Sequence, residues 1–209
     1  MVNMEQKTFF RIKTPFPELK EDKIDTVLFL DAASGVADFC DLLGKVFSPV
    51  KSDINGNVDK IRKAYQLQPD AYRHLNDLII IEAPKKMSSV SLEALLWLKR
   101  GLEFMFVFLN DIVEDKETPP SENISAFCCN AYEKTLKPYH GWIVQSLFQL
   151  CSKACPYRKN LLKAIALQQD GMEDVIIEEA KIYLRLLKQD LDVLNKLYAH
   201  YDLDDKRIV

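Results

Sequence analysis

The stretch SLEALLWLKRGLEFMFVFLNDIV, residues 91–113, decides the fold class. Apolar side chains cover almost its whole circumference, which is typical of a helix in the middle of a bundle. Lys99 and Arg100 interrupt this surface shortly after Trp97. A buried cation needs a partner, so Asp53 or a neighbouring carboxylate is the candidate. Alternatively, the two cations extend to water at one end of the helix.

Further helices are predicted on both sides of this segment. The 209 residues include only 6 glycines, and the prolines lie mostly between periodic segments, as in helices joined by short loops. Residues 1–20 look irregular because Pro15 and Pro17 exclude a helix there. Strand patterns are scarce, so the fold class is all-α. The predicted helices span residues 24–43, 53–65, a third that opens at Pro69, 91–113, 123–136, 139–153, 158–167 and 173–201.

Length and composition predict a single domain over residues 1–209. An apolar content of 48% supplies one sizeable core, and a formal net charge of -3 argues against binding of nucleic acid by the chain as a whole. No apolar run approaches the ~18 residues of a membrane span, and the first residues lack a signal-peptide core. The cysteines lack the histidines or CxxC pairs of a zinc site. We expect a monomeric cytoplasmic protein without metal or cofactor.

Positive charge is concentrated in one part of the chain. Residues 134–169 contain six basic residues and no acidic one, which leaves 22 basic residues against all 31 acidic residues elsewhere. Trp142 lies within this segment. The segment is either an ordinary solvated surface or a face that meets phospholipid head groups.

Three separated motifs carry the polar chemistry. They are VKSDINGNVDKIRK (residues 50–63) with Asp53, Asn57 and Lys60, LLWLKRGLEF (95–104) with Trp97, and KPYHGWIVQ (137–145) with His140 and Trp142. Together they supply an acceptor, an amide, a cation, an indole and an imidazole, which suits the binding of a polar head group. Taken singly, a polar helix stripe usually faces water, and a tryptophan on an apolar helix usually belongs to the core.

In this order and at this spacing, the motifs resemble the glycolipid transfer protein family, whose members carry D-x-x-x-N-x-x-K, W-L-K-R-G and H-G-W. The resemblance runs from about Phe39 to Tyr198. It implies a two-layer sandwich of about eight helices that encloses an apolar lipid tunnel. It also implies non-enzymatic transfer, or sensing, of glycosphingolipids such as glucosylceramide, galactosylceramide and lactosylceramide.

The resemblance also implies a role for each polar residue. Asp53 would accept a hydrogen bond from the ceramide amide N–H, and His140 would donate one to the acyl carbonyl. Asn57 and Lys60 would bind hydroxyls of the first sugar, whose apolar face would stack on Trp97. A donor and an acceptor on one amide discriminate against lipids that lack it, because the buried polar groups would stay unpaired.

Two further sets of residues follow from the resemblance. The lipid tails would lie in a tunnel lined by Phe47, Phe104, Phe108, Leu136, Phe148 and Leu161. Transient contact with the membrane would fall to Trp142, helped by Ile143 and Tyr157, since an exposed indole suits the depth of the lipid head groups. By composition alone, the tunnel residues are simply core residues.

The family pattern is broken at four positions, and three alternatives stay open. Glu93 replaces an apolar residue, Arg207 a tyrosine, Ser146 a lysine and Lys153 a tyrosine, so the preferred sugar is not fixed.

A ceramide-1-phosphate carrier of the same superfamily would use Lys60 and Arg100 for phosphate, and a lipid-sensing adaptor would use the same pocket without transfer. A hydrolase would combine His140 and Asp53 with Cys151 or Ser146 as nucleophile, although no nucleophile motif accompanies them.

Overall fold

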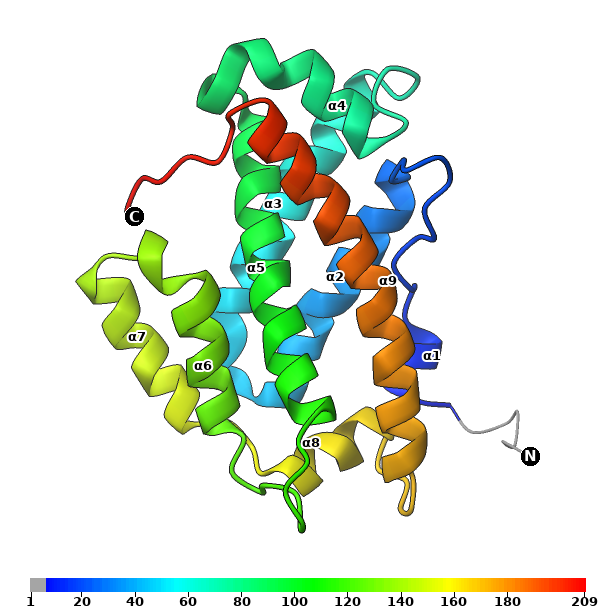
Figure 1. The fold of residues 1–209 in the computed structure, drawn as a ribbon, viewed down its shortest axis with the longest axis vertical. Coiled ribbons are helices and arrows are strands. Elements are labelled where there is room, and N and C mark those ends of the chain that lie inside the picture. Colours follow the sequence, from blue (N-terminus) through cyan, green and yellow to red (C-terminus); the bar gives the residue numbers. More distant parts are fainter. Residues whose placement is uncertain (1–6) are drawn as a thin grey trace.

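The computed structural model describes residues 7–209, and helices dominate this range (Figure 1). Nine α-helices lie within it: α1 (Phe9–Ile12), α2 (Thr26–Leu43), α3 (Ser48–Leu67), α4 (Leu75–Glu82), α5 (Val90–Val113), α6 (Ser125–Thr135), α7 (Trp142–Lys153), α8 (Arg158–Ile165) and α9 (Glu173–His200). Short 3₁₀ turns η1 (Lys45–Phe47), η2 (Ala83–Ser88) and η3 (Lys137–Tyr139) connect some of them. Between residues 7 and 209 the backbone forms isolated β-bridges but no strand, so the all-α class is confirmed.

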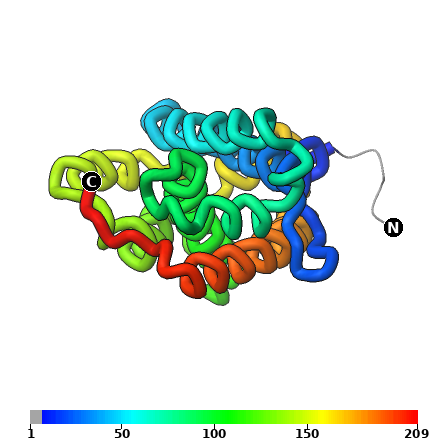
Figure 2. Tube along the Cα trace, turned by 90° about the horizontal axis from the view of Figure 1, so that it is seen from above, coloured from blue at the N-terminus to red at the C-terminus, as the bar shows by residue number. Residues whose placement is uncertain are grey.

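The helix predicted to be central, α5, does lie in the middle of the molecule. It packs against α3 on one side and against α6 and α9 on the other, and α2 packs on α3. Figure 2 shows α5 between α3 and α9. Leu95, Leu102 and Phe108 on α5 are 0% exposed, which agrees with apolar side chains around its circumference. The helices therefore form a sandwich with its core around α5.

Local signals explain where the main helices begin. The side chain of Asp25 accepts a hydrogen bond from the Leu28 N–H at the start of α2, and Ser89 does the same for Leu92 at the start of α5. Pro49 occupies the first turn of α3, where its missing N–H costs nothing. This explains why α3 begins at Ser48, five residues before the predicted start.

Two predictions near the N-terminal end need correction. The third helix begins at Leu75 rather than at Pro69, because residues 72–75 hydrogen bond with residues 24–26. The N-terminal segment is not irregular throughout, since α1 forms one turn ahead of Pro15 and Pro17. Residues 1–6 of that prediction lie outside the described range.

The helix predicted over residues 139–153 begins at Trp142, three residues after the predicted start. His140 is extended, with φ of -105° and ψ of 133°. The Val209 N–H donates to the Tyr139 carbonyl at 2.9 Å, and the Gly141 N–H donates to the Val209 carbonyl at 2.6 Å. A Cβ on residue 141 would lie only 3.2 Å from that carbonyl oxygen, so glycine permits this approach. His140 and Trp142 therefore do not share a helix, contrary to the expectation.

Of the two alternatives for the cations of α5, burial holds rather than extension to water, and neighbouring carboxylates rather than Asp53 are the partners. The Lys99 ammonium donates to Asn195 at 2.7 Å and to Glu103 at 3.2 Å. The Arg100 guanidinium donates to Asp204 at 2.9 Å. Both are therefore paired by carboxylates or amides nearer to them, as a buried charge requires.

Candidate functional site

One cavity of about 530 Å³ lies between α3, α5 and α7. All five residues predicted to bind a head group line it, although they come from three separate parts of the chain: Asp53, Asn57, Lys60, Trp97 and His140. Its volume falls within the range usual for ligand pockets, about 300–1,000 Å³. The structure thus gathers the three motifs into one site.

The cavity changes from polar to apolar along its length. On α5, Glu93, Trp97, Gly101 and Phe104 line the wall, and this spacing of three and four residues places them on one helix face. Helix α3 runs toward α4 and α5 runs away from it, so their polar turns lie at the same end (Figure 1). On α7 the lining residues are Val144, Leu147, Phe148 and Cys151. A polar end near Lys60 therefore continues into an apolar end.

Asp53 and Asn57 form a coupled polar pair on α3. The Asn57 side-chain amide donates to the Asp53 carboxylate at 3.3 Å. Asp53 is open to solvent through the cavity, yet burial by surrounding protein raises its pKa, against the opposing effects of Lys60 and the Asn57 hydrogen bond. A ligand N–H group that donates a hydrogen bond to this carboxylate would stabilise its charged form.

His140 is held as a neutral hydrogen-bonding group. Its Nδ1 lies 3.0 Å from the Tyr132 hydroxyl. Burial, and secondarily the positive charge of Arg100, lowers the pKa of His140. Burial raises the pKa of Tyr132 to about 12, so the phenol keeps its proton. When the phenol donates to Nδ1, the Nε2 of His140 carries the ring proton and is a donor for a ligand.

Trp97 is half-buried, and its ring contacts the cationic side chain of Arg100. Its ring stacks on that of His140 with centroids 6.1 Å apart and planes 18° apart. The Arg100 guanidinium lies 5.0 Å from the Trp97 ring centroid and 3.4 Å from that of Tyr139. These cation–π contacts fix the orientation of the indole. Trp97 is therefore a wall of the cavity rather than an ordinary core residue.

The six predicted tunnel residues divide into two groups. Phe104, Leu136 and Phe148 line the cavity. Phe47, Phe108 and Leu161 are at most 1% exposed and lie in the core outside it. The rings of Phe104 and Phe108 stack at 6.2 Å, so Phe108 lies directly behind the wall. A tunnel through all six residues stays a prediction.

The predicted membrane residues lie on the surface. Trp142 is 77% exposed, and Ile143 and Tyr157 are also exposed. Leu147 and Leu150 on α7 are exposed as well and extend this apolar surface, and Leu147 reaches the cavity. The sequence argument missed both. Their spacing from Ile143, four and seven residues, was the available signal.

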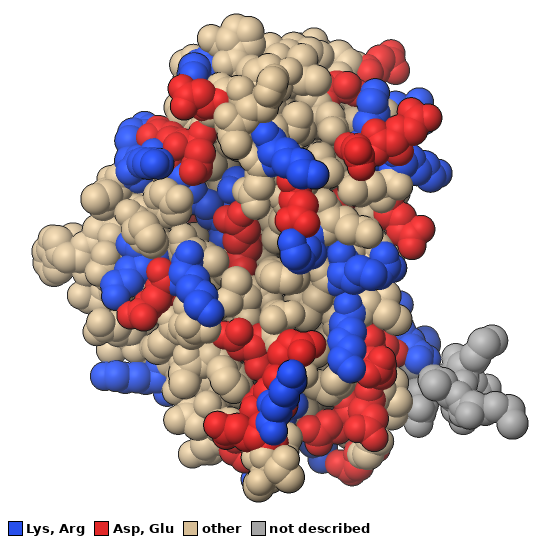
Figure 3. All heavy atoms as spheres, viewed as in Figure 1, with Lys and Arg blue, Asp and Glu red and all other residues tan. Residues whose placement is uncertain are grey.

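The surface around this patch is less positive than the sequence suggests. Arg158 is buried beside Asp115 and Glu173, and Lys137 pairs with Glu133. Lys163 pairs with Asp170, a carboxylate that lies just after the basic segment of residues 134–169. On the face drawn in Figure 3, basic and acidic side chains are interspersed. Three of the six basic residues of this segment are thus paired with carboxylates, which reduces its attraction for anionic lipid.

The nucleophiles considered for a hydrolase are not activated. The Ser146 hydroxyl donates to the Trp142 carbonyl at 2.8 Å, and the Cys151 thiol donates to the Val46 carbonyl at 3.4 Å. Burial raises the pKa of Cys151, which disfavours the reactive thiolate. His140 hydrogen bonds with Tyr132 instead of either group.

Comparisons with known proteins agree with these features. A model of the family described as glycolipid transfer protein (GLTP) matches residues 24–167. The glycolipid transfer protein of Danio rerio is 36% identical over 198 residues, which cover 90% of this chain and 94% of that protein.

Solved structures share the fold. A structure of FAPP2, described as selecting simple glycosphingolipids with the GLTP-fold, has a TM-score of 0.85 at 29% identity and covers 97% of this chain and 100% of that one. Human ceramide-1-phosphate transfer protein bound to 12:0 ceramide-1-phosphate has a TM-score of 0.78, with coverage of 95% and 96%. At 19% identity it supports the fold alone. With a family model over most of its length and close relatives across nearly all of it, the chain belongs to the glycolipid transfer protein family.

Proposed function

We propose that the chain carries glycosphingolipids between membranes by binding the sugar and amide in the polar end of the cavity and the tails in its apolar end. The observation that supports this most is the meeting of Asp53, Trp97 and His140 on one cavity whose remaining wall is largely apolar. An acceptor at Asp53 and a donor at His140 Nε2 suit the two sides of one amide. The named function of the Danio rerio relative and the description of FAPP2 point the same way.

A sugar fits this site better than a phosphate. Phosphate sites usually combine several cations. Arg100, which a phosphate site would need, is buried and committed to Asp204. Among the described residues that line the cavity, Lys60 is the one lysine or arginine, and it shares the wall with Asp53 and Glu93. This favours hydroxyl-rich head groups over ceramide-1-phosphate.

The transfer would be non-enzymatic and would proceed from transient contact of a monomer with the cytosolic face of a membrane. Docking would use Trp142 and Ile143, which lie on the helix that forms one wall of the cavity. No helix among residues 7–209 has the length and apolar content needed to cross a bilayer. Covering a tail of ~16 carbons at ~0.8 kcal/mol per methylene needs about 13 kcal/mol of apolar matching. The tails would therefore have to displace core side chains such as Phe104 and reach Phe108.

Filling the cavity is expected to block transfer without harming the fold. A Cβ on Gly101 meets no atom within 4 Å, so Gly101→Leu adds an apolar side chain to the space proposed for lipid. We expect transfer of galactosylceramide between vesicles to fall about tenfold or more, by analogy with overpacking costs. The thermal midpoint should not fall, because leucine favours a helix over glycine by up to ~1 kcal/mol.

Gly56→Leu is the matched control for this experiment. Gly56 is also helical, also has nothing within 4 Å of its Cβ and does not line the cavity. Undiminished transfer by Gly101→Leu would count against lipid in this cavity. Lipid binding by the wild type without any transfer would identify a sensor rather than a carrier.

Removing the exposed indole is expected to weaken docking on vesicles. Trp142→Ala should lower the affinity for neutral phosphatidylcholine vesicles about tenfold, since inserting a large apolar side chain is worth about 1.5–3 kcal/mol. Sedimentation with vesicles measures this directly. Leu67→Ala, at an 82% exposed leucine that ends α3, should have no effect. Equal binding by all three proteins would remove Trp142 from the docking surface.

A further inference from the structure

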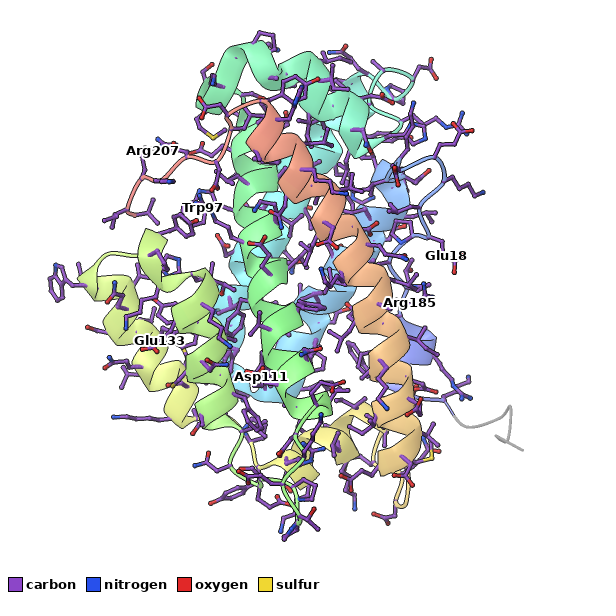
Figure 4. The ribbon with its side chains drawn as sticks, in the orientation of Figure 1. Glu18, Trp97, Asp111, Glu133, Arg185 and Arg207 are labelled. Atoms are coloured by element: carbon purple, nitrogen blue, oxygen red, sulfur yellow. The ribbon has the colours of Figure 1, made fainter. Side chains whose placement is uncertain are left out.

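Two of the residues that break the family pattern contact each other at the polar end of the cavity. The Arg207 Nη2 donates to Glu93 Oε1 at 2.9 Å, although the two residues are 114 positions apart. Glu93 lines the cavity one helical turn before Trp97. Figure 4 shows Arg207 on the C-terminal segment, on the same side of α5 as Trp97. The two departures therefore form one structural unit beside the proposed sugar site.

The segment that carries Arg207 is fixed independently of this ion pair. Arg100 anchors its start through Asp204 at 2.9 Å. Backbone hydrogen bonds join Val209 to Tyr139 and Gly141, on either side of His140. Val209 itself lines the cavity. Neutralising Glu93 or Arg207 therefore leaves the wall of the site in place.

The charges around this end sum to a negative value. Arg207 is shared between two carboxylates, because its Nε donates to Asp205 while its Nη2 donates to Glu93. Lys60 faces a third carboxylate, that of Asp53, across the same wall. Arg100, which lies against Trp97, is itself paired with Asp204. With that pair included, four carboxylates stand against three cations. An anionic sugar substituent would meet a guanidinium whose Nε and Nη2 already donate to carboxylates, and it would be repelled by the excess negative charge.

We propose that Glu93 and Arg207 are specificity-determining residues that select uncharged sugar head groups over sulfated ones. This inference rests on the proposed glycosphingolipid site and names the class of lipid that it accepts. Hydroxyl groups of a neutral sugar can donate to these carboxylates, whereas a sulfate ester can only accept hydrogen bonds. The discrimination is therefore electrostatic rather than steric.

The test measures binding of galactosylceramide and of its 3-sulfated form to the wild type, Glu93→Gln and Arg207→Gln. The wild type should prefer the neutral lipid. Glu93→Gln removes a negative charge and frees Arg207, so the preference should shrink about fivefold, whereas Arg207→Gln should enlarge it by a similar factor, as one partly exposed charge contributes about 1 kcal/mol. Both shifts should weaken with added salt.

The opposite signs separate a charge filter from simple loosening of the site. Loosening would weaken the binding of both lipids by both variants and leave the ratio of the two affinities unchanged. That result would overturn the inference. A wild type that prefers the sulfated lipid would overturn it too. Glu178→Gln, in an exposed pair with Lys181 on α9, is the control and should leave the ratio unaltered. If the wild type binds neither lipid, the proposed function itself fails.

Discussion

Asp53→Val is expected to reduce galactosylceramide transfer between vesicles about ten- to a hundredfold, because a hydrogen bond to a charged group contributes about 1.5–3 kcal/mol. The change removes the acceptor proposed for the ceramide amide N–H and leaves that donor unpaired in a largely apolar cavity. It also removes the acceptor of the hydrogen bond from the Asn57 amide, the side chain proposed to bind a sugar hydroxyl. A fluorescent lipid-transfer assay measures the rate, and native mass spectrometry measures the loss of bound lipid.

Asp59→Val provides the matched control on the same helix. Asp59 is exposed on α3 and does not line the cavity. It should transfer lipid at the wild-type rate, and both variants should retain the helical circular dichroism of the wild type. Equal transfer by Asp53→Val and wild type would exclude Asp53 from the head-group site.

Asp190→Asn is expected to stabilise the protein above neutral pH. Asp190 lies in α9 with 0% exposure, and neither of its carboxylate oxygens accepts a hydrogen bond from a described residue. Burial raises its pKa to about 8. The folded protein therefore keeps Asp190 protonated at pH 7, whereas the unfolded chain ionises near pH 4.

The sign of the pH dependence follows from this difference. Between about pH 4 and pH 8 the folded state binds one more proton than the unfolded state, so this group makes stability fall as pH rises. At about 1.36 kcal/mol per pKa unit, the cost at pH 7 relative to acid pH is on the order of 4 kcal/mol. Asparagine cannot ionise, so the variant lacks this cost. Its advantage over the wild type should grow from pH 5 to pH 8.

Urea denaturation at several pH values measures this effect. Asp192→Asn is the control, because Asp192 is exposed on the same helix and pairs with Lys188. An exposed pair contributes at most about 1 kcal/mol, and Asp192→Asn should show no growing gain with pH. A wild type whose stability rises from pH 5 to pH 8 in parallel with Asp190→Asn would show that Asp190 ionises normally.

The sequence predicted the fold class and the central helix correctly because their signals are local. The apolar circumference of α5 and the sparse glycines required no knowledge of tertiary contacts. The predicted helix boundaries were wrong where hydrogen bonds with distant segments of the chain determine them. His140 lies in extended backbone because residues 139 and 141 hydrogen bond with Val209, far along the chain, and no pattern within residues 137–145 contains that information.

The candidate site shows the same division. Its five head-group residues were predicted from motif resemblance, and the structure brings them onto one cavity. The hydrogen bond between Tyr132 and His140 was not predicted, because nothing in the sequence marks one tyrosine among eight as the partner of His140. The sequence also showed Glu93 and Arg207 only as separate departures from the family pattern. Their contact follows from the return of the C-terminal segment to α5.

Native mass spectrometry after incubation with mixed lipid vesicles tests the central claim most directly. The vesicles should contain galactosylceramide, ceramide-1-phosphate and phosphatidylcholine in equal amounts. We expect one bound lipid per chain, with the mass of galactosylceramide and both of its tails, and its loss in Asp53→Val. A bound mass equal to ceramide-1-phosphate, or no bound lipid at all, would contradict a cavity built for the sugar and amide of a glycosphingolipid.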